Sequence, residues 1–204
     1  MIALEFEQRS PEWFAARCGI PTASSFDKII TPTGKASTQA EAYGFTVLAE
    51  RLTGYAQSWS GNQWTERGAE LEDEARGYYE FVTGRTVQPV GFCLTDDRMV
   101  GCSPDGLIGE DGALELKCPK PETHVKYLLK GGMVSDYIPQ VQGQLYVTGR
   151  QWVDFVSYCR GIEALIVRVA RDQAYIDVLA KQLLAFNVDL KAKETILRAK
   201  GYMA

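Results

Sequence analysis

Apolar and polar positions follow two spacings along this chain, one typical of helices and one of strands. Helical spacing predicts helices over 11–17, from Thr22 or Ser24 onward, over 39–53, over 64–82, over 123–130, around Pro139 and over 172–200. Strand-like apolar stretches are expected near 86–94, 99–108, 113–118, 152–159 and 164–169. Residues 31–38 and 55–63 are rich in turn formers and are expected to be loops. This order of elements indicates an α/β sandwich, in which ligands gather at sheet edges.

The predicted helix 64–82 combines a narrow apolar stripe with many acids. The stripe consists of Leu71, Ala75, Tyr78 and Val82. Glu72 lies on one flank of this stripe, and Glu70 and Glu74 lie on the other. A carboxylate at the stripe's edge is within reach of a metal on the sheet beneath, but periodicity leaves open which flank supplies it. On the predicted helix 39–53 the apolar side consists of Ala42, Phe45, Leu48, Ala49 and Leu52.

Composition indicates one globular domain. The chain has 204 residues, of which 46% are hydrophobic and 24% charged, enough to bury a substantial core. It contains no run of about 18 apolar residues, which excludes a membrane-spanning helix. The first residues lack the basic-then-apolar layout of a secretion signal, so we expect a cytoplasmic protein.

Cysteine and histidine usage narrows the chemistry. The five cysteines are scattered and include no C-x-x-C pair, which argues against zinc and iron–sulfur sites and favours buried thiols in a reducing compartment. His124 is the only histidine, so Ser-His-Asp catalysis and histidine-rich metal sites are not expected. Any metal here must be bound by oxygen.

The formal net charge of −4 argues weakly against a nucleic-acid partner. Its distribution is uneven, however. Between residues 117 and 130 a single acid, Glu122, accompanies the lysines at 117, 120, 126 and 130. This local excess of lysine suits either contact with phosphates or an ordinary solvated helix face.

The most informative segment runs from Gly101 to Cys118 and contains Asp105, Glu115 and Lys117 in the pattern D-x9-E-x-K. Positions two apart on a strand share a face, so Glu115 and Lys117 point the same way and Leu116 points into the core. Asp105 lies at a Pro-Asp-Gly turn, from which its carboxylate can return beside Glu115. Two hard oxygen ligands next to an ammonium group suit Mg²⁺ and an attacking water, the requirements for cleaving a phosphodiester.

A plainer reading is a turn residue and a solvated ion pair, since charged residues on a sheet usually face water. The surrounding residues favour the functional reading because they predict strands buried on at least one face. These apolar neighbours are Val100, Cys102, Leu107, Ile108, Leu114 and Leu116. Charges at the rim of a buried sheet need a partner, and a divalent cation supplies one.

Six short motifs occur in an order that resembles the PD-(D/E)xK nuclease superfamily and, within it, the phage lambda exonuclease family of viral recombination nucleases. The similarity runs from about Glu12 to Thr148. The motifs are Trp13-x3-Arg17, Thr22-Ala-Ser24, Gly68-x3-Glu72-x2-Ala75-Arg76, Cys102-Ser-Pro-Asp-Gly106, Leu114-Glu-Leu-Lys-Cys-Pro119 and Gln140-Val-Gln142. Each alone is weak, but all six in order are specific.

The resemblance implies a central mixed β-sheet flanked by helices and a Mg²⁺-dependent exonuclease, with Mn²⁺ as a possible substitute and two ions per site. Such enzymes digest one strand of duplex DNA from its 5′ end to mononucleotides, leave 3′ single-stranded tails, form a homotrimeric ring and work with a single-strand annealing protein. By motif, Asp105, Glu115, the backbone carbonyl of Leu116 and Glu72 would hold metal. Lys117 would orient or activate the attacking water.

The resemblance also implies that Arg17, Ser24, Ser103 and Gln140 hold the 5′-terminal phosphate. An arginine fork suits a terminal phosphate, and hydroxyl and amide groups complete its hydrogen bonds. Three further DNA contacts are weaker expectations. They are Lys35 in the 31–38 loop, Trp64 as a stacking wedge, and Gln142, which we expect mainly to support Gln140.

We therefore expect one nuclease domain. Residues 1–63 would form the N-terminal helices and DNA-end loops, 64–170 the catalytic core and 171–204 the C-terminal helix. An endonuclease of the same superfamily, such as a restriction or junction-resolving enzyme, is the related alternative. A non-catalytic scaffold that binds DNA ends is the contrasting one, and an intact Asp105, Glu115 and Lys117 argues against it. The host would be a bacterial cell carrying the phage or prophage.

Overall fold

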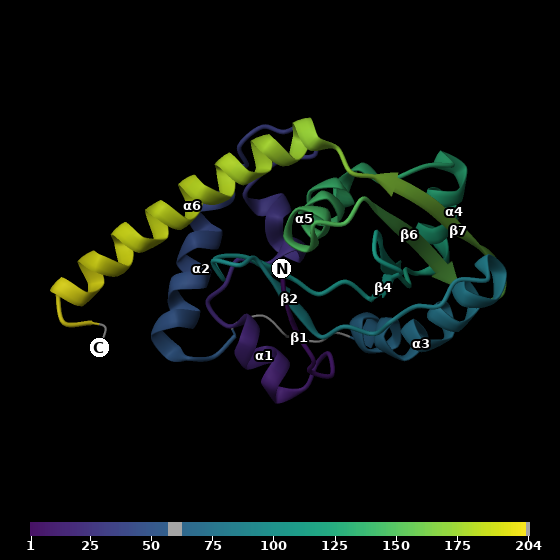
Figure 1. Ribbon diagram of the computed structural model, residues 1–204, viewed down its shortest axis with the longest axis horizontal. Coiled ribbons are helices and arrows are strands. Elements are labelled where there is room, and N and C mark those ends of the chain that lie inside the picture. Colours follow the sequence, from purple (N-terminus) through teal and green to yellow (C-terminus); the bar gives the residue numbers. More distant parts are fainter. Residues whose placement is uncertain (57–62, 203–204) are drawn as a thin grey trace.

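The computed structural model describes the backbone of residues 1–56 and 63–202 and the side chains of residues 1–56 and 71–202. Figure 1 shows the order and placement of the elements. The helices are α1 (Pro11–Arg17), α2 (Ala40–Thr53), α3 (Gln63–Thr83), α4 (Pro121–Lys130), α5 (Ile138–Thr148) and α6 (Gln173–Ala199), with 3₁₀ turns η1 (Ala23–Lys28) and η2 (Ser135–Tyr137). The strands are β1 (Ile2–Leu4), β2 (Phe92–Leu94), β3 (Gly101–Cys102), β4 (Gly106–Ile108), β5 (Gly112–Lys117), β6 (Trp152–Cys159) and β7 (Ile162–Ala170).

The strands form two sheets. The smaller has the order β1-β2-β3 and is antiparallel, and the larger has the order β4-β5-β6-β7. In the larger sheet β5 and β6 are parallel, whereas the other two pairs are antiparallel. The expected mixed sheet flanked by helices is therefore confirmed.

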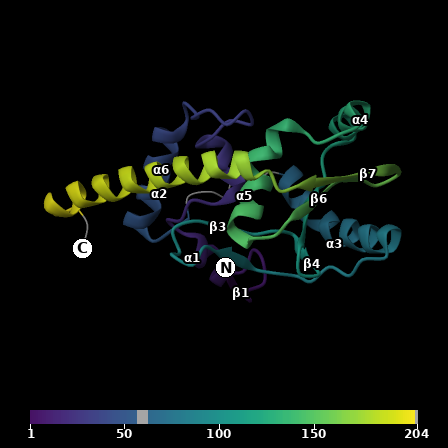
Figure 2. The same cartoon turned by 45° about the horizontal axis from the view of Figure 1, so that its top comes forward.

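Helices cover both faces of the larger sheet, and Figure 2 shows α3 and α4 on opposite sides of it. Leu114 and Leu116 of β5 pack in one apolar cluster with Tyr79 of α3. Ala113 packs in another with Val141 of α5. Because side chains alternate along a strand, Glu115 and Lys117 must face α5. The charged side chains of Glu115 and Lys117 therefore lie on the face of the sheet that α5 covers.

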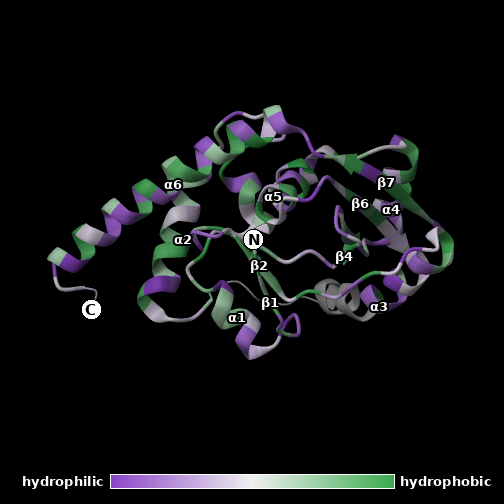
Figure 3. Ribbon diagram, viewed as in Figure 1, coloured by the Kyte–Doolittle hydropathy of each residue, from purple (hydrophilic) through white to green (hydrophobic). Residues whose placement is uncertain are grey.

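A further apolar cluster joins the smaller sheet to η1, α2 and α6. Phe26 of η1 and Val47 of α2 lie at its centre, together with Leu179 and Leu190 of α6. The outer part of α6 extends away from the body (Figure 1), and Figure 3 shows apolar and polar positions alternating along it. The expected division of the domain at residues 63 and 170 stays a prediction. None of the helices in the described ranges is long and apolar enough to cross a membrane.

Several predicted elements differ from the structure. The expected strand 99–108 is two strands, β3 and β4, in different sheets. They are separated at Pro104, which has no backbone N–H to donate to a ladder. β1 was not expected, and the helix expected from Thr22 or Ser24 is the short 3₁₀ turn η1.

The buried faces of two helices also differ from the predicted stripes. Tyr79 of α3 is buried and Val82 is exposed, because the Tyr79 hydroxyl donates to buried Asp154 at 2.6 Å. On α2, Phe45 and Leu52 are exposed, and Tyr43 is buried in their place. Both buried tyrosines have partners for their hydroxyls, which hydropathy spacing does not register.

The single histidine lies between α4 and the larger sheet. His124 is fully buried, with its Nδ1 2.7 Å from the Ser157 hydroxyl and its Nε2 2.9 Å from the Glu163 carbonyl oxygen. This ring joins α4 to the sheet and has no free nitrogen for a metal. All five cysteines are free thiols; Cys93, Cys102 and Cys159 are buried as expected, whereas Cys18 and Cys118 are partly exposed.

Close packing of α5 on η1 gives a stability prediction. A Cβ added at Gly143 would lie 2.5 Å from a ring carbon of Phe26, whereas one added at Gly77 on the exposed side of α3 meets nothing within 4 Å. We expect Gly143→Ala to destabilise the fold by about 1–3 kcal/mol through overpacking. Gly77→Ala should stabilise it by about 0.5–1 kcal/mol through helix propensity. Urea unfolding of both variants measures the two effects, and equal shifts would contradict the predicted contact.

Candidate active site

The candidate site begins where the pairing of β4 with β5 ends. The last paired residues are Gly106 and Leu114. Just before β4, the Asp105 amide donates to the Leu114 carbonyl at 3.0 Å, and the Asp105 carboxylate accepts from the Leu116 amide at 2.5 Å. The N–H and C=O of one strand residue point to the same edge, so the Leu116 carbonyl faces the edge occupied by Asp105. The structure thus places Asp105 and this carbonyl side by side, as the motif implied.

Glu115 is the most enclosed acid of the site, with 2% of its surface exposed. Its Oε1 accepts from Lys117 Nζ at 2.5 Å and from Gln140 Nε2 at 2.6 Å, and its Oε2 accepts from Gln144 Nε2. Gln140 Oε1 in turn accepts from Lys117 at 3.2 Å. A buried carboxylate needs such donors to offset its lost hydration. Glu115, Lys117 and Gln140 therefore form one connected polar group under α5.

Electrostatics mark this edge as rich in negative charge. Burial, and then the charges of Glu115 and Glu72, raise the pKa of Asp105 well above its usual range. Burial alone would lower the pKa of Lys117, but the Glu115 and Asp105 carboxylates hold it above its ordinary value. Lys117 therefore stays protonated beside these acids.

Glu72 approaches from the opposite face of the sheet, on α3. Its carboxylate accepts from Arg9 Nη2 at 2.5 Å, and it shares a cleft of about 610 Å³ with Asp105. Burial raises the pKa of Glu72, and Arg9 opposes that rise. Of the opposite flank, Glu74 pairs instead with Arg160 and Tyr158, and the side chain of Glu70 lies outside the described residues. The structure brings Glu72 to the site edge and turns Glu74 away.

These donors suit a hard divalent cation. Within the described ranges, no three carboxylate, thiolate or imidazole side chains are close enough to enclose an ion. The expected ligand set includes three such carboxylates, those of Asp105, Glu115 and Glu72, together with the Leu116 carbonyl, and it stays a prediction. All are oxygen ligands of the kind that Mg²⁺ and Mn²⁺ prefer. Burial, and then the neighbouring carboxylates, raise the pKa of Asp105, and a bound cation would favour its ionised form.

A second polar group lies at the end of α1. The Arg17 guanidinium donates to the Ser103 hydroxyl at 3.0 Å and to the hydroxyls of Thr22 and Ser24 at 3.5 Å each. It also lies over the Trp13 ring, 4.1 Å from its centroid. Trp13 Nε1 donates to Ser103 at 2.9 Å, which fixes that hydroxyl between the two side chains. Arg17, Ser24 and Ser103 are thus brought together.

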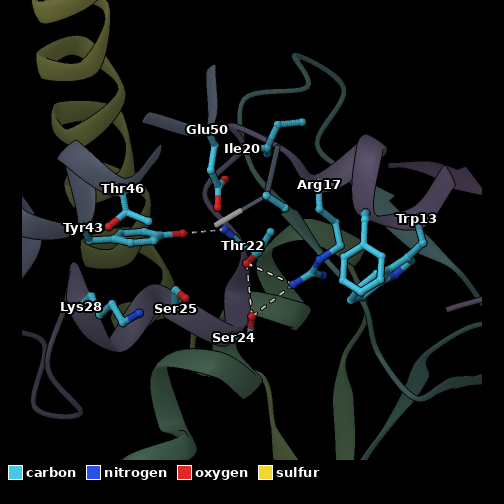
Figure 4. Close-up of a pocket in the computed structure, with 12 residues that line it drawn as sticks. Trp13, Arg17, Ile20, Thr22, Ser24, Ser25, Lys28, Tyr43, Thr46 and Glu50 are labelled. Carbon is cyan, nitrogen blue, oxygen red and sulfur yellow. Dashed lines mark hydrogen bonds between the residues drawn. The ribbon is translucent and has the colours of Figure 1, made fainter. Parts of the chain in front are cut away.

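Figure 4 shows Arg17 and Ser24 at the wall of a cavity of about 280 Å³. Burial lowers the pKa of Arg17 to about 10, so its charge persists at neutral pH. Ser103 precedes Asp105 by two residues, which joins this pocket to the acid cluster through one short loop. Gln140, the remaining residue expected to bind phosphate, lies beside Lys117 and Glu115.

Gln142 requires a correction. Only 3% of its surface is exposed, its Nε2 donates to the Ala170 carbonyl, and its Oε1 accepts from the Asp172 amide. It therefore joins α5 to the β7–α6 junction, and the expectation that it contacts DNA and supports Gln140 is wrong. Two positions after Gln140 on a helix, its side chain points about 200° away.

The structure says less about the two other expected DNA contacts, Lys35 and Trp64. Lys35 is exposed in the 31–38 loop, where its backbone amide donates to the Thr31 hydroxyl. Trp64 belongs to the first turn of α3, but its side chain lies outside the described residues.

Sequence reasoning missed two partners of the acids, Gln144 and Arg9. Gln144 lies four residues after Gln140, so the two share a helix face, and this i,i+4 spacing was the available signal. Arg9 precedes α1 and meets Glu72 across 63 positions, for which the sequence offers no signal.

Comparison with known proteins identifies the family. The sequence model of the YqaJ-like viral recombinase domain matches residues 12–151, a range that contains Arg17, Glu72, Asp105, Glu115 and Lys117. The chain belongs to this family. The expected kinship with phage recombination nucleases is confirmed.

Solved structures of exonucleases resemble this chain. An alkaline exonuclease from Laribacter hongkongensis, LHK-Exo, is 37% identical, with a TM-score of 0.86 over 94% of this chain and 98% of its own. The structure of LHK-Exo in complex with dAMP matches with 36% identity and a TM-score of 0.85, over 96% of this chain and 100% of that one.

A phage-related exonuclease from Haemophilus somnus 129PT has a TM-score of 0.70 at 16% identity, covering 87% of this chain and 96% of that one. This likeness shows the fold alone. No curated protein matches the sequence significantly.

Proposed function

We propose that this YqaJ-like protein is a Mg²⁺-dependent 5′→3′ exonuclease. It would degrade one strand of linear double-stranded DNA to mononucleotides and leave 3′ single-stranded tails for recombination by strand annealing. Its similarity to an alkaline exonuclease over nearly the whole chain supports a DNA exonuclease. A related structure holding dAMP, a deoxynucleoside monophosphate, is consistent with mononucleotide products.

One observation carries the proposal: an arginine–hydroxyl pocket and an acid–lysine cluster lie at the two ends of a three-residue segment. Ser103 accepts from Arg17, and Asp105 accepts from the Leu116 amide beside Glu115. Two residues of extended chain span about 7 Å. A strand end whose terminal phosphate is held by Arg17 would therefore present its first phosphodiester to the cluster. This arrangement favours DNA ends over internal bonds.

Each residue of the site has its own role in the proposed reaction. Arg17, Ser24 and Ser103 bind the terminal phosphate and fix the register of the strand. Asp105, Glu115, the Leu116 carbonyl and Glu72 would hold one or two Mg²⁺ ions, which when bound would polarise the phosphodiester and lower the pKa of the attacking water. Lys117 orients that water and stabilises negative charge that develops at phosphate oxygens. Gln140 keeps the Lys117 ammonium in place.

The remaining functional expectations belong to the same proposal. The DNA would pass Lys35 and Trp64 before the strands separate. The protein would act as a ring-shaped homotrimer, with a single-strand annealing protein as partner, in the cytoplasm of the bacterial host of a phage or prophage.

Digestion of end-labelled DNA tests the proposal. A linear duplex with 5′ phosphates should be shortened from its 5′ ends in Mg²⁺, with labelled mononucleotides as the first products, and should be untouched in EDTA. A covalently closed circle should remain intact. Cleavage of the circle would favour an endonuclease, and binding of ends without any cleavage would favour a scaffold.

Arg17→Ala tests the phosphate pocket. The change removes the guanidinium that Ser103 and Ser24 position, so we expect digestion of 5′-phosphorylated duplex to slow by about 10- to 100-fold, as for loss of one charged contact. The same duplex with 5′-hydroxyl ends is the control, and its slower digestion should change little. Arg17→Lys keeps the charge but not the planar fork, so its rate on 5′-phosphorylated duplex should lie between those of the wild type and Arg17→Ala. Equal losses on both substrates would rule out a role in recognising the end.

A further inference from the structure

Arg9 lies at the edge of the acid cluster in an uncommon backbone conformation. Its φ is 71°, in the left-handed region. Of the other non-glycine residues that the structure describes, only Arg98, with φ 58°, has a positive φ. Arginine adopts this conformation at some conformational cost, which the surrounding structure must offset. The turn before α1 therefore holds Arg9 in a specific place.

Gln8 fixes that turn to the segment that precedes Asp105. Its Nε2 donates to the carbonyl oxygens of Val90 and Pro104, each at 2.8 Å. Pro104 immediately precedes Asp105, so the residue before Arg9 is bonded to the residue before Asp105. The position of the guanidinium is thereby coupled to the position of the acids.

From this turn the Arg9 guanidinium reaches the Glu72 carboxylate at 2.5 Å. The pair borders the cleft that Asp105 also lines, and its side chains are 37% and 25% exposed. A divalent cation that approaches Glu72 through the cleft meets a carboxylate whose Oε1 already accepts from this arginine, so the two cations compete for its negative charge. The pair is accessible enough for such an exchange.

We propose that Arg9 is a built-in counter-ion of Glu72 that competes with the divalent cation for this carboxylate and so sets the cation affinity of the site. The inference rests on the proposed role of Glu72 as a metal ligand. Arg9 is a positioning residue: without cation it holds Glu72 and offsets the charge of neighbouring acids, and it releases Glu72 when the cation binds. The affinity of the site is then weaker than its oxygen ligands alone would give.

Calorimetric titration of DNA-free protein with Ca²⁺ tests this without relying on turnover. Arg9→Gly removes the guanidinium and tolerates positive φ without strain, so the fold should be retained. We expect the Ca²⁺ dissociation constant to fall by about three- to tenfold, the range for losing one partly buried, charge-assisted bond. Arg9→Lys, which keeps a cation beside Glu72, should stay within about twofold of the wild-type constant.

Two controls separate the proposal from simpler effects. Arg98→Gly removes the same charge and the same kind of backbone strain in the exposed turn between β2 and β3, away from the cleft, and should leave the constant unchanged. In a Glu72→Gln background, Arg9→Gly should leave the Ca²⁺ dissociation constant unchanged, because the carboxylate for which Arg9 and the cation compete is absent. An unchanged constant in Arg9→Gly, or equal tightening in the Glu72→Gln background, would overturn the proposal. Absence of Ca²⁺ binding in every variant would instead overturn the metal site itself, and with it the proposed function.

Discussion

Asp105→Asn is expected to reduce the rate of duplex digestion by at least about a thousandfold, because it removes a charged metal ligand at the centre of the site. Asparagine has nearly the same shape, and its Oδ1 can still accept the hydrogen bond that the Leu116 amide gives to Asp105. The fold should therefore survive. Single-turnover digestion of an end-labelled 5′-phosphorylated duplex measures the loss.

The same variant should be at least as stable as the wild type when no cation is present. Burial and the neighbouring acids raise the pKa of Asp105 in the folded protein above its value in the unfolded chain. At a pH above the ordinary carboxyl pKa, this aspartate therefore lowers the free energy of unfolding. A neutral amide removes that penalty, and the melting temperature in EDTA should be equal or higher. Binding of DNA ends should persist, since Arg17 is untouched.

Asp177→Asn is the matched control for this experiment. Asp177 is exposed on α6 and accepts a hydrogen bond from Gln173. Its substitution should leave digestion unchanged. If Asp105→Asn retained a rate within about tenfold of the wild type, the assignment of this carboxylate to the reaction would be wrong.

Lys117→Met should have the second large effect, again a loss of about a thousandfold or more in the single-turnover rate. Methionine fills a similar volume but supplies no ammonium to orient water or to stabilise phosphate charge. The substitution also removes one of three donors to the buried Glu115 carboxylate. Because Gln140 and Gln144 remain, we expect a destabilisation of only about 1–3 kcal/mol.

A double variant shows how much of the lost stability comes from the buried charge of Glu115. Adding Glu115→Gln to Lys117→Met removes the uncompensated buried charge, so much of the lost stability should return while the activity stays absent. Lys130→Met, in the exposed last turn of α4, is the control for loss of one lysine. Recovery of digestion together with stability in the double variant would contradict the proposed roles of both Lys117 and Glu115.

The sequence by itself determined the spacing on which the site depends. Strand alternation assigns Glu115 and Lys117 to one face of β5 and Leu116 to the other, as the packing shows. The Pro-Asp-Gly turn located Asp105 near the start of the adjoining strand. The order of the six motifs identified the family and with it the mixed sheet. These features follow from local geometry, which sequence periodicity records directly.

Tertiary structure alone decided which face meets which neighbour. Helical spacing could not choose between the flanks of α3. Packing on the sheet placed Glu72 in the cleft that Asp105 lines, and Glu74 beside Arg160.

The same spacing could not show that Gln144 would approach Glu115 while Gln142 turned to the β7–α6 junction. Nor could it pair Arg9 with an acid 63 positions away. The reason is physical: periodicity states which residues share a face, but the partner of that face depends on how distant elements pack.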